Sequence, residues 1–119
     1  FASTQYGYSF QYDSSWNVRN YGAVDSLTPE MAGITAAGTK DAILVAVKNT
    51  SYQDQVAVGE GTTESTTVAG VSGTKKFLKT PEGTATKIIL PFNDKSLIIV
   101  AKPGQEANLN TTLETFKLQ

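Results

Sequence analysis

Hydrophobic and polar residues alternate over several stretches of the chain, and this pattern predicts a β-rich fold. Aromatic residues at positions 6, 8, 10 and 12 are separated by small or polar residues, which is the period-two pattern of a half-buried strand. Ala42–Lys48 is an almost unbroken apolar run, typical of a central strand covered on both faces. Thr84–Phe92 and Ser96–Lys102 flank the short polar loop Asn93–Lys95, so they predict a hairpin.

Other segments give weaker strand patterns. Glu64–Val68 and Ser72–Leu78 fit two strands joined by a turn at Ala69-Gly70, because glycine supplies the backbone conformation that tight turns need. Ala23–Leu27 fits a weakly patterned strand. Met31–Gly38 fits either a short strand or an irregular loop, and its pattern does not separate the two.

Two short helices are expected among these strands. Ser51 would cap the first, with Asp54 at its third helical position as a weak capping box. Near the end of the chain, apolar residues at positions 109, 113 and 116 share one helical face. Asn108 or Asn110 would cap this C-terminal helix.

The length of 119 residues is that of one ordinary domain, so we expect residues 1–119 to form a single unit. Ten basic and eleven acidic residues leave a net charge of −1, without the concentrated positive field that nucleic-acid binding needs. The only basic cluster, Lys75-Lys76 with Lys79, fits a solvated strand face that blunts edge pairing.

No apolar stretch approaches the roughly 20 residues that span a bilayer. The sequence starts at Phe1 rather than Met, which leaves room for a preceding signal or anchor segment. The chain has no histidine and no cysteine, and this excludes a disulfide framework, a thiolate nucleophile, a cysteine-type zinc site and a Ser-His-Asp triad. We therefore expect no cofactor and no enzyme activity.

Three segments together match a known pattern: YGYSFQYDSSW at 6–16, TVAGV at 67–71 and LETFKL at 113–118. They resemble the start, the central hairpin and the end of PsbP-like domains. The resemblance implies an α+β fold with a central antiparallel β-sheet, a C-terminal helix and a short helical insert, in an exported bacterial protein outside the cytoplasm. Asp13 stands where these domains usually have proline, and the segment between Lys48 and Glu64 is shorter than their usual helix.

Aromatic residues are concentrated in the first fifth of the chain. The candidate binding residues are Tyr6, Tyr8, Tyr12, Trp16 and Tyr21. Their rings could form a stacking platform for a sugar or a peptide. Packing in the core is the favoured interpretation, because aromatic side chains dominate core burial. Tyr6 and Tyr21 are expected to be partly exposed.

Two further patterns could carry chemistry. Ser72 and Lys75 match S-x-x-K, a motif that needs a helix, whereas a hairpin is expected here. Glu60 and Glu64 are the only close pair of acids, so they are weak candidates for a calcium site or for carboxylate-dependent hydrolysis. A solvated loop is the favoured interpretation of this pair, because acids are rarely buried without partners.

These observations favour a non-catalytic, exported binding or accessory domain with a protein or glycan partner. The alternative is a structural subunit that self-associates into a surface layer or filament, because low net charge and exposed strand edges are compatible with lateral assembly. A hydrolase that uses Glu60 or Glu64 is a third, minor hypothesis.

Overall fold

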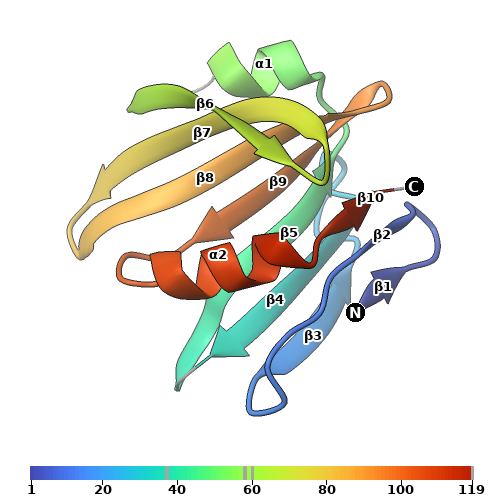
Figure 1. The fold of residues 1–119 in the computed structure, drawn as a ribbon. Coiled ribbons are helices and arrows are strands. Elements are labelled where there is room, and N and C mark those ends of the chain that lie inside the picture. The colour runs from blue at the N-terminus through green and yellow to red at the C-terminus, as the bar shows by residue number, and fades with distance from the viewer. Residues whose placement is uncertain (37, 58, 60, 119) are drawn as a thin grey trace.

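The computed structural model describes residues 1–36, 38–57, 59 and 61–118, and a seven-stranded antiparallel sheet dominates it (Figure 1). Its strands are β3 (Asn17–Gly22), β4 (Glu30–Ala36), β5 (Thr39–Lys48), β6 (Thr62–Val68), β7 (Val71–Thr80), β8 (Gly83–Phe92) and β9 (Lys95–Ala101). They lie in the order β3-β4-β5-β9-β8-β7-β6. The chain therefore makes one meander, crosses to the far edge and returns in a second meander that closes against β5.

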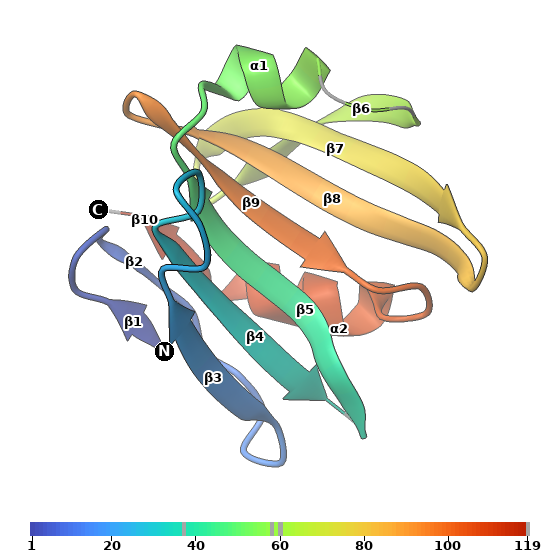
Figure 2. The same cartoon turned by 180° about the vertical axis from the view of Figure 1, so that it is seen from behind.

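A small sheet and two helices complete the fold. The small sheet has the order β1-β2-β10 and consists of β1 (Ala2–Ser3), β2 (Tyr8–Ser9) and β10 (Lys117–Leu118). Helix α2 (Glu106–Glu114) crosses one face of the large sheet, in front of it in Figure 1 and behind it in Figure 2. Helix α1 (Tyr52–Ala57) lies on the opposite face, where Gln55 Oε1 accepts a hydrogen bond from Lys87 Nζ at 3.3 Å.

The expected α+β class is wrong, because the chain is mostly β, with 57% of residues in strands and 13% in helices. The helical insert has only six residues, and the left-handed glycines Gly59 and Gly61 follow it. The C-terminal helix has nine residues and ends before Phe116, which is buried. The helices are too short to form a layer of their own, although the antiparallel sheet is confirmed.

The core lies between the large sheet and the layer formed by α2 and the small sheet. It contains Tyr8, Phe10, Ile34, Ile43, Val45, Val47, Val68, Ile88, Leu90, Phe92, Leu97, Ile99, Ala101, Leu109 and Phe116. The expected β8–β9 hairpin is confirmed, with Leu90 opposite Leu97. The expected cap of α1 is also confirmed, because Ser51 Oγ accepts a hydrogen bond from Asp54 N at 3.1 Å.

Two local expectations are corrected, and one segment that was left open proves to be a strand. No strand covers Ala23–Leu27, because Asp25 Oδ1 accepts the Leu27 N–H at 2.9 Å and turns the chain. The ambiguous segment after Pro29 is β4, whose residues are buried on both faces and so show no alternation. Gln105, not Asn108 or Asn110, is the N-cap of α2, and it makes no side-chain capping bond. Neither described helix is long and apolar enough to cross a membrane.

Candidate functional site

Most of the N-terminal aromatic side chains pack inside the molecule. Tyr8 is 1% exposed, and its ring stacks on Phe116 with centroids 5.9 Å apart. Tyr6 and Trp16 are half-buried and pack against the same core. Tyr12 is 41% exposed, and its ring centroid lies 6.4 Å from that of buried Phe10. These residues mainly join the small sheet to the large one.

Tyr21 lies on the other side of the large sheet and fastens edge strand β3 to β5. Its hydroxyl lies 2.9 and 2.7 Å from the two carboxylate oxygens of Asp41, and this hydrogen bond raises the pKa of Tyr21. Between them, β4 carries Gly33, where a Cβ would lie 2.1 Å from Asp41 Oδ1 and 2.9 Å from Tyr21 Cε2. Arg19 approaches the Tyr21 ring at 5.9 Å. Contacts with Asp41 and Arg19 of the same chain therefore fix the position of the Tyr21 ring.

The candidate chemical pairs are not assembled into a site. Ser72 and Lys75 lie on strand β7, and their odd spacing puts their side chains on opposite faces of the sheet. Glu60 lies outside the described residues, and Glu64 is an exposed residue of β6 opposite Lys75. Within the described part of the chain, no group of three or more acidic, histidine or cysteine side chains could hold a metal.

Strand β6 forms the other edge of the large sheet, and this edge is more open than the one at β3. It pairs with β7 in an uninterrupted register from Thr62 opposite Phe77 to Val68 opposite Val71. The two turn residues between them, Ala69 and Gly70, have φ values of 53° and 80°, as a two-residue hairpin turn requires.

The hairpin geometry determines which backbone groups of β6 point outwards. In such a hairpin the closing pair shares its hydrogen bonds, and hydrogen-bonded pairs then alternate along the ladder. Thr63, Ser65 and Thr67 therefore direct their backbone N–H and C=O groups away from β7. No described strand lies beyond β6, so these groups form an open edge.

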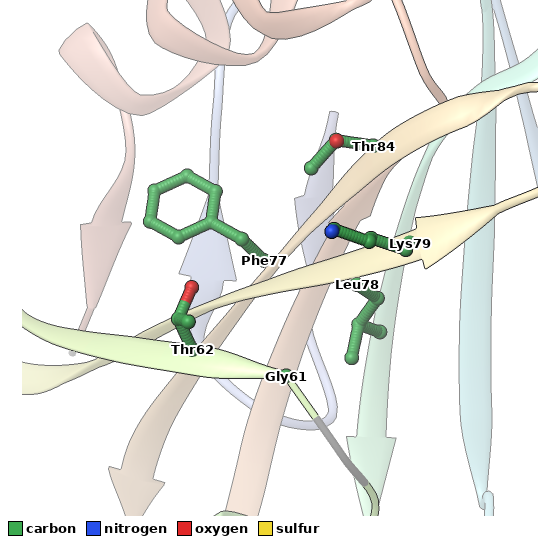
Figure 3. Close-up of a pocket in the computed structure, with 6 residues that line it drawn as sticks. All are labelled: Gly61, Thr62, Phe77, Leu78, Lys79 and Thr84. Carbon is green, nitrogen blue, oxygen red and sulfur yellow. The ribbon is translucent and has the colours of Figure 1, made fainter.

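A cleft of about 480 Å³ lies where β6 begins (Figure 3). Its lining residues are Gly61, Thr62, Phe77, Leu78, Lys79 and Thr84. The cleft forms because β7 continues through Leu78–Thr80, past the last described pair with β6. Gly61 has a φ of 123°, and a Cβ there would lie 2.4 Å from the Phe77 carbonyl oxygen. Only glycine allows the chain to enter β6 so close to β7.

The strands beside this edge are strongly basic. β6, β7 and β8 together contain four lysines and one acid, Glu64. Lys79 is exposed at the cleft, and Lys75 Nζ lies 5.3 Å from the centre of the Phe77 ring. Burial, and then the charges of Lys76 and Lys48, lower the pKa of Lys87. Lys75 and Lys79 share the face of β7 that carries Phe77, so positive charge lies on this face beside the cleft.

The sequence interpretation placed the lysines correctly on a strand but misjudged their surroundings. β7 is an inner strand, so its lysines do not blunt an edge, and Lys76 is buried rather than solvated. The open edge is β6, whose sequence carries four threonines among seven residues. This threonine density was the available signal, but it indicates a strand and not its position in the sheet.

No family model matches the chain, and no curated protein matches its sequence.

Proposed function

We propose that this chain is a non-catalytic binding domain that recruits another protein by adding an extended segment of that protein to the outer edge of β6. The open row of backbone groups at Thr63, Ser65 and Thr67 carries the proposal. Strand addition of this kind obtains affinity from main-chain hydrogen bonds and specificity from pockets for alternate side chains. The cleft at Gly61 and Lys79 supplies such a pocket beside the edge.

The composition of β6 supports this role. Exposed edges are commonly protected by lysine, proline, a bulge or short length. β6 has seven residues in continuous register, with no lysine and no proline, and Glu64 is its only charged residue. Its β-branched threonines favour an extended backbone, so the strand is already in the conformation that a partner segment needs.

We also propose a family and a cellular location for the protein. We place the chain among PsbP-like domains, outside the bacterial cytoplasm, on the strength of its three matching segments. One of these, Thr67–Val71, forms the β6–β7 turn, and another, Leu113–Leu118, ends α2 and forms β10. These segments form a turn, parts of strands and the end of a helix, and they do not specify a ligand, so the proposed binding role rests on the β6 edge, of which Thr67 is a part.

Self-association would use the same edge and is the competing function. In the fully overlapped antiparallel register of two β6 strands, Ser65 of each copy lies opposite Ser65 of the other. Glu64 of one copy is then opposite Thr66 and diagonally across from the second Glu64, on the same face of the joined sheet. Diagonal neighbours lie about 7–8 Å apart, within reach of long side chains, so repulsion between the two glutamates disfavours this register. We therefore propose a different chain, rather than a second copy, as the occupant of the edge.

The test uses a library of phage-displayed peptides selected on the purified domain and counter-screened on two variants. Ser65→Pro removes an outward N–H, and an edge strand tolerates proline there because the ladder to β7 keeps its bonds. Ser65→Ala changes the same side chain and keeps the N–H. We expect enriched peptides to bind the wild type and Ser65→Ala equally and to lose at least about tenfold in affinity for Ser65→Pro.

Two further outcomes decide against the proposal. Peptides that bind Ser65→Pro as well as the wild type would show that β6 is not the docking edge. If no peptide is enriched and the wild type forms concentration-dependent oligomers that Ser65→Pro abolishes, the edge serves self-association instead. Sedimentation velocity of both proteins provides that measurement.

A further inference from the structure

We infer that the segment added to β6 carries an acidic side chain at the cleft and a neutral or basic one beside Glu64, two residues away on the same face. This inference rests on the proposed strand addition. It assigns the charge pattern of the partner, which the open edge alone does not specify.

The first step is the alternation of side chains on β6. Thr62, Glu64 and Thr66 share one face of the sheet, because side chains two apart in a strand point the same way. Phe77 lies opposite Thr62 and Lys75 lies opposite Glu64, so the aromatic ring and this lysine are on that face as well. A partner strand would place every second side chain on the same face.

The second step is the change of charge along that face. Glu64 is exposed in the middle of β6, and Lys79 is exposed at the cleft. Within the described residues neither has an ion-pair partner, since the single salt bridge there joins Lys95 to Asp94. An acid opposite Glu64 would meet a like charge, whereas an acid opposite Thr62 would approach Lys79.

The third step is the shape of the cleft. Figure 3 shows Phe77 and Thr62 directed to one side of the strand pair and Leu78 to the other, with Lys79 at the open end. A glutamate entering from the added strand could pack its methylene groups on the Phe77 ring and direct its carboxylate to Lys79 Nζ. A long acidic side chain therefore satisfies both the apolar wall and the charge of the cleft.

The experiment uses synthetic peptides of alternating threonine and valine that differ at one position, with binding followed by fluorescence anisotropy. One series carries Glu, Gln or Lys at the position opposite Thr62, and a second series carries the same residues opposite Glu64. We expect Glu to bind roughly fivefold more tightly than Lys in the first series and Lys more tightly than Glu in the second. Added salt should reduce both differences.

Two variants distinguish a failure of the inferred charge pattern from a failure of strand addition itself. In Lys79→Glu the first series should reverse its order while the second is unchanged, and Lys79→Gln should remove the preference without reversing it. If the peptides bind, lose affinity for Ser65→Pro, and show no charge preference, strand addition stands and the charge pattern is wrong. If no peptide binds the wild type, both are wrong.

Discussion

The two edges of the large sheet are built differently. Five of the six residues of β3 pair with β4, and the register shifts between Asn20 and Gly22. Tyr21, which the shift leaves without a β4 partner, is hydrogen-bonded to Asp41 of β5. At β6, seven residues pair with β7 in continuous register. Bulges and charged side chains keep a strand edge from pairing with other chains, so β3 is protected and β6 is not.

The protection of β3 has a local cost. Asp41 adopts a φ of 49°, a left-handed conformation that is uncommon outside glycine, although aspartate and asparagine tolerate it best. Gly33 has no side chain, and this leaves the space above it in which Tyr21 and Asp41 form their hydrogen bond. Within the described residues, no comparable arrangement closes β6. Any strand addition is therefore directed to the β6 edge of the large sheet. Four predictions test this contrast, from the largest effect to the smallest.

Thr66→Pro should have the largest effect, because Thr66 directs its N–H towards β7, opposite Gly73. Proline removes that ladder bond, which we expect to lower the free energy of unfolding by about 2–3 kcal/mol. Ser65→Pro, one residue away with an outward N–H, should lower it by less than about 1 kcal/mol. Urea denaturation measures both, and equal losses would show that the alternation assigned to β6 is wrong.

Gly33→Ala should be the next most costly change. The new Cβ would overlap Asp41 Oδ1 and the Tyr21 ring, and overpacking of this kind costs about 1–3 kcal/mol. The Tyr21→Ala variant provides the matched background, because it removes the ring that the added methyl group would displace. Gly33→Ala should cost less in that background, and strictly additive losses would separate Gly33 from the Tyr21–Asp41 contact.

The Tyr21–Asp41 contact should make stability fall at high pH. The hydrogen bond to Asp41 raises the pKa of Tyr21, so the unfolded tyrosine, with a pKa of about 10, loses its proton first. The unfolded state then binds fewer protons, and stability declines as pH rises from that value through the folded pKa. Tyr21→Phe should make this decline shallower in urea denaturation repeated from neutral to alkaline pH.

Tyr8 adds to the same decline and must be separated from Tyr21. Burial, and then the nearby Glu30 carboxylate, raise the pKa of Tyr8. Its hydroxyl has no hydrogen-bond partner of normal geometry among the described residues. Tyr8→Phe and the double variant with Tyr21→Phe therefore serve as controls. A wild-type slope that persists in the double variant would contradict the assignment.

Single charge removals should give the smallest effects and still distinguish the edges. Arg19→Gln removes the cation beside the Tyr21 ring, which we expect to cost about 0.5–1 kcal/mol. Lys79→Gln removes an exposed charge from the cleft and should change stability by less than about 0.5 kcal/mol. Thermal denaturation compares the two, and a larger loss for Lys79→Gln would mean that the cleft stabilises the fold.

The local elements near the turns could be predicted because their signals are local. Asn93 and the polar residues beside it mark the β8–β9 turn, and Ser51 marks the start of α1. β4 could not be predicted in this way, because burial on both faces removes the alternation that identifies a strand. Tyr21 was a candidate from its residue type alone, and its partner Asp41 lies twenty residues away.

The sequence by itself determined the β-rich character, the main hairpins and the absence of histidine and cysteine chemistry, since these follow from residue type and short-range periodicity. Only the tertiary structure decided that β6 is an open edge, that β7 is an inner strand and that Lys79 and Phe77 line one cleft. Strand order depends on pairings between distant segments, such as Ile43 with Ala101. Those pairings arise from burial of the whole core, which no local pattern encodes.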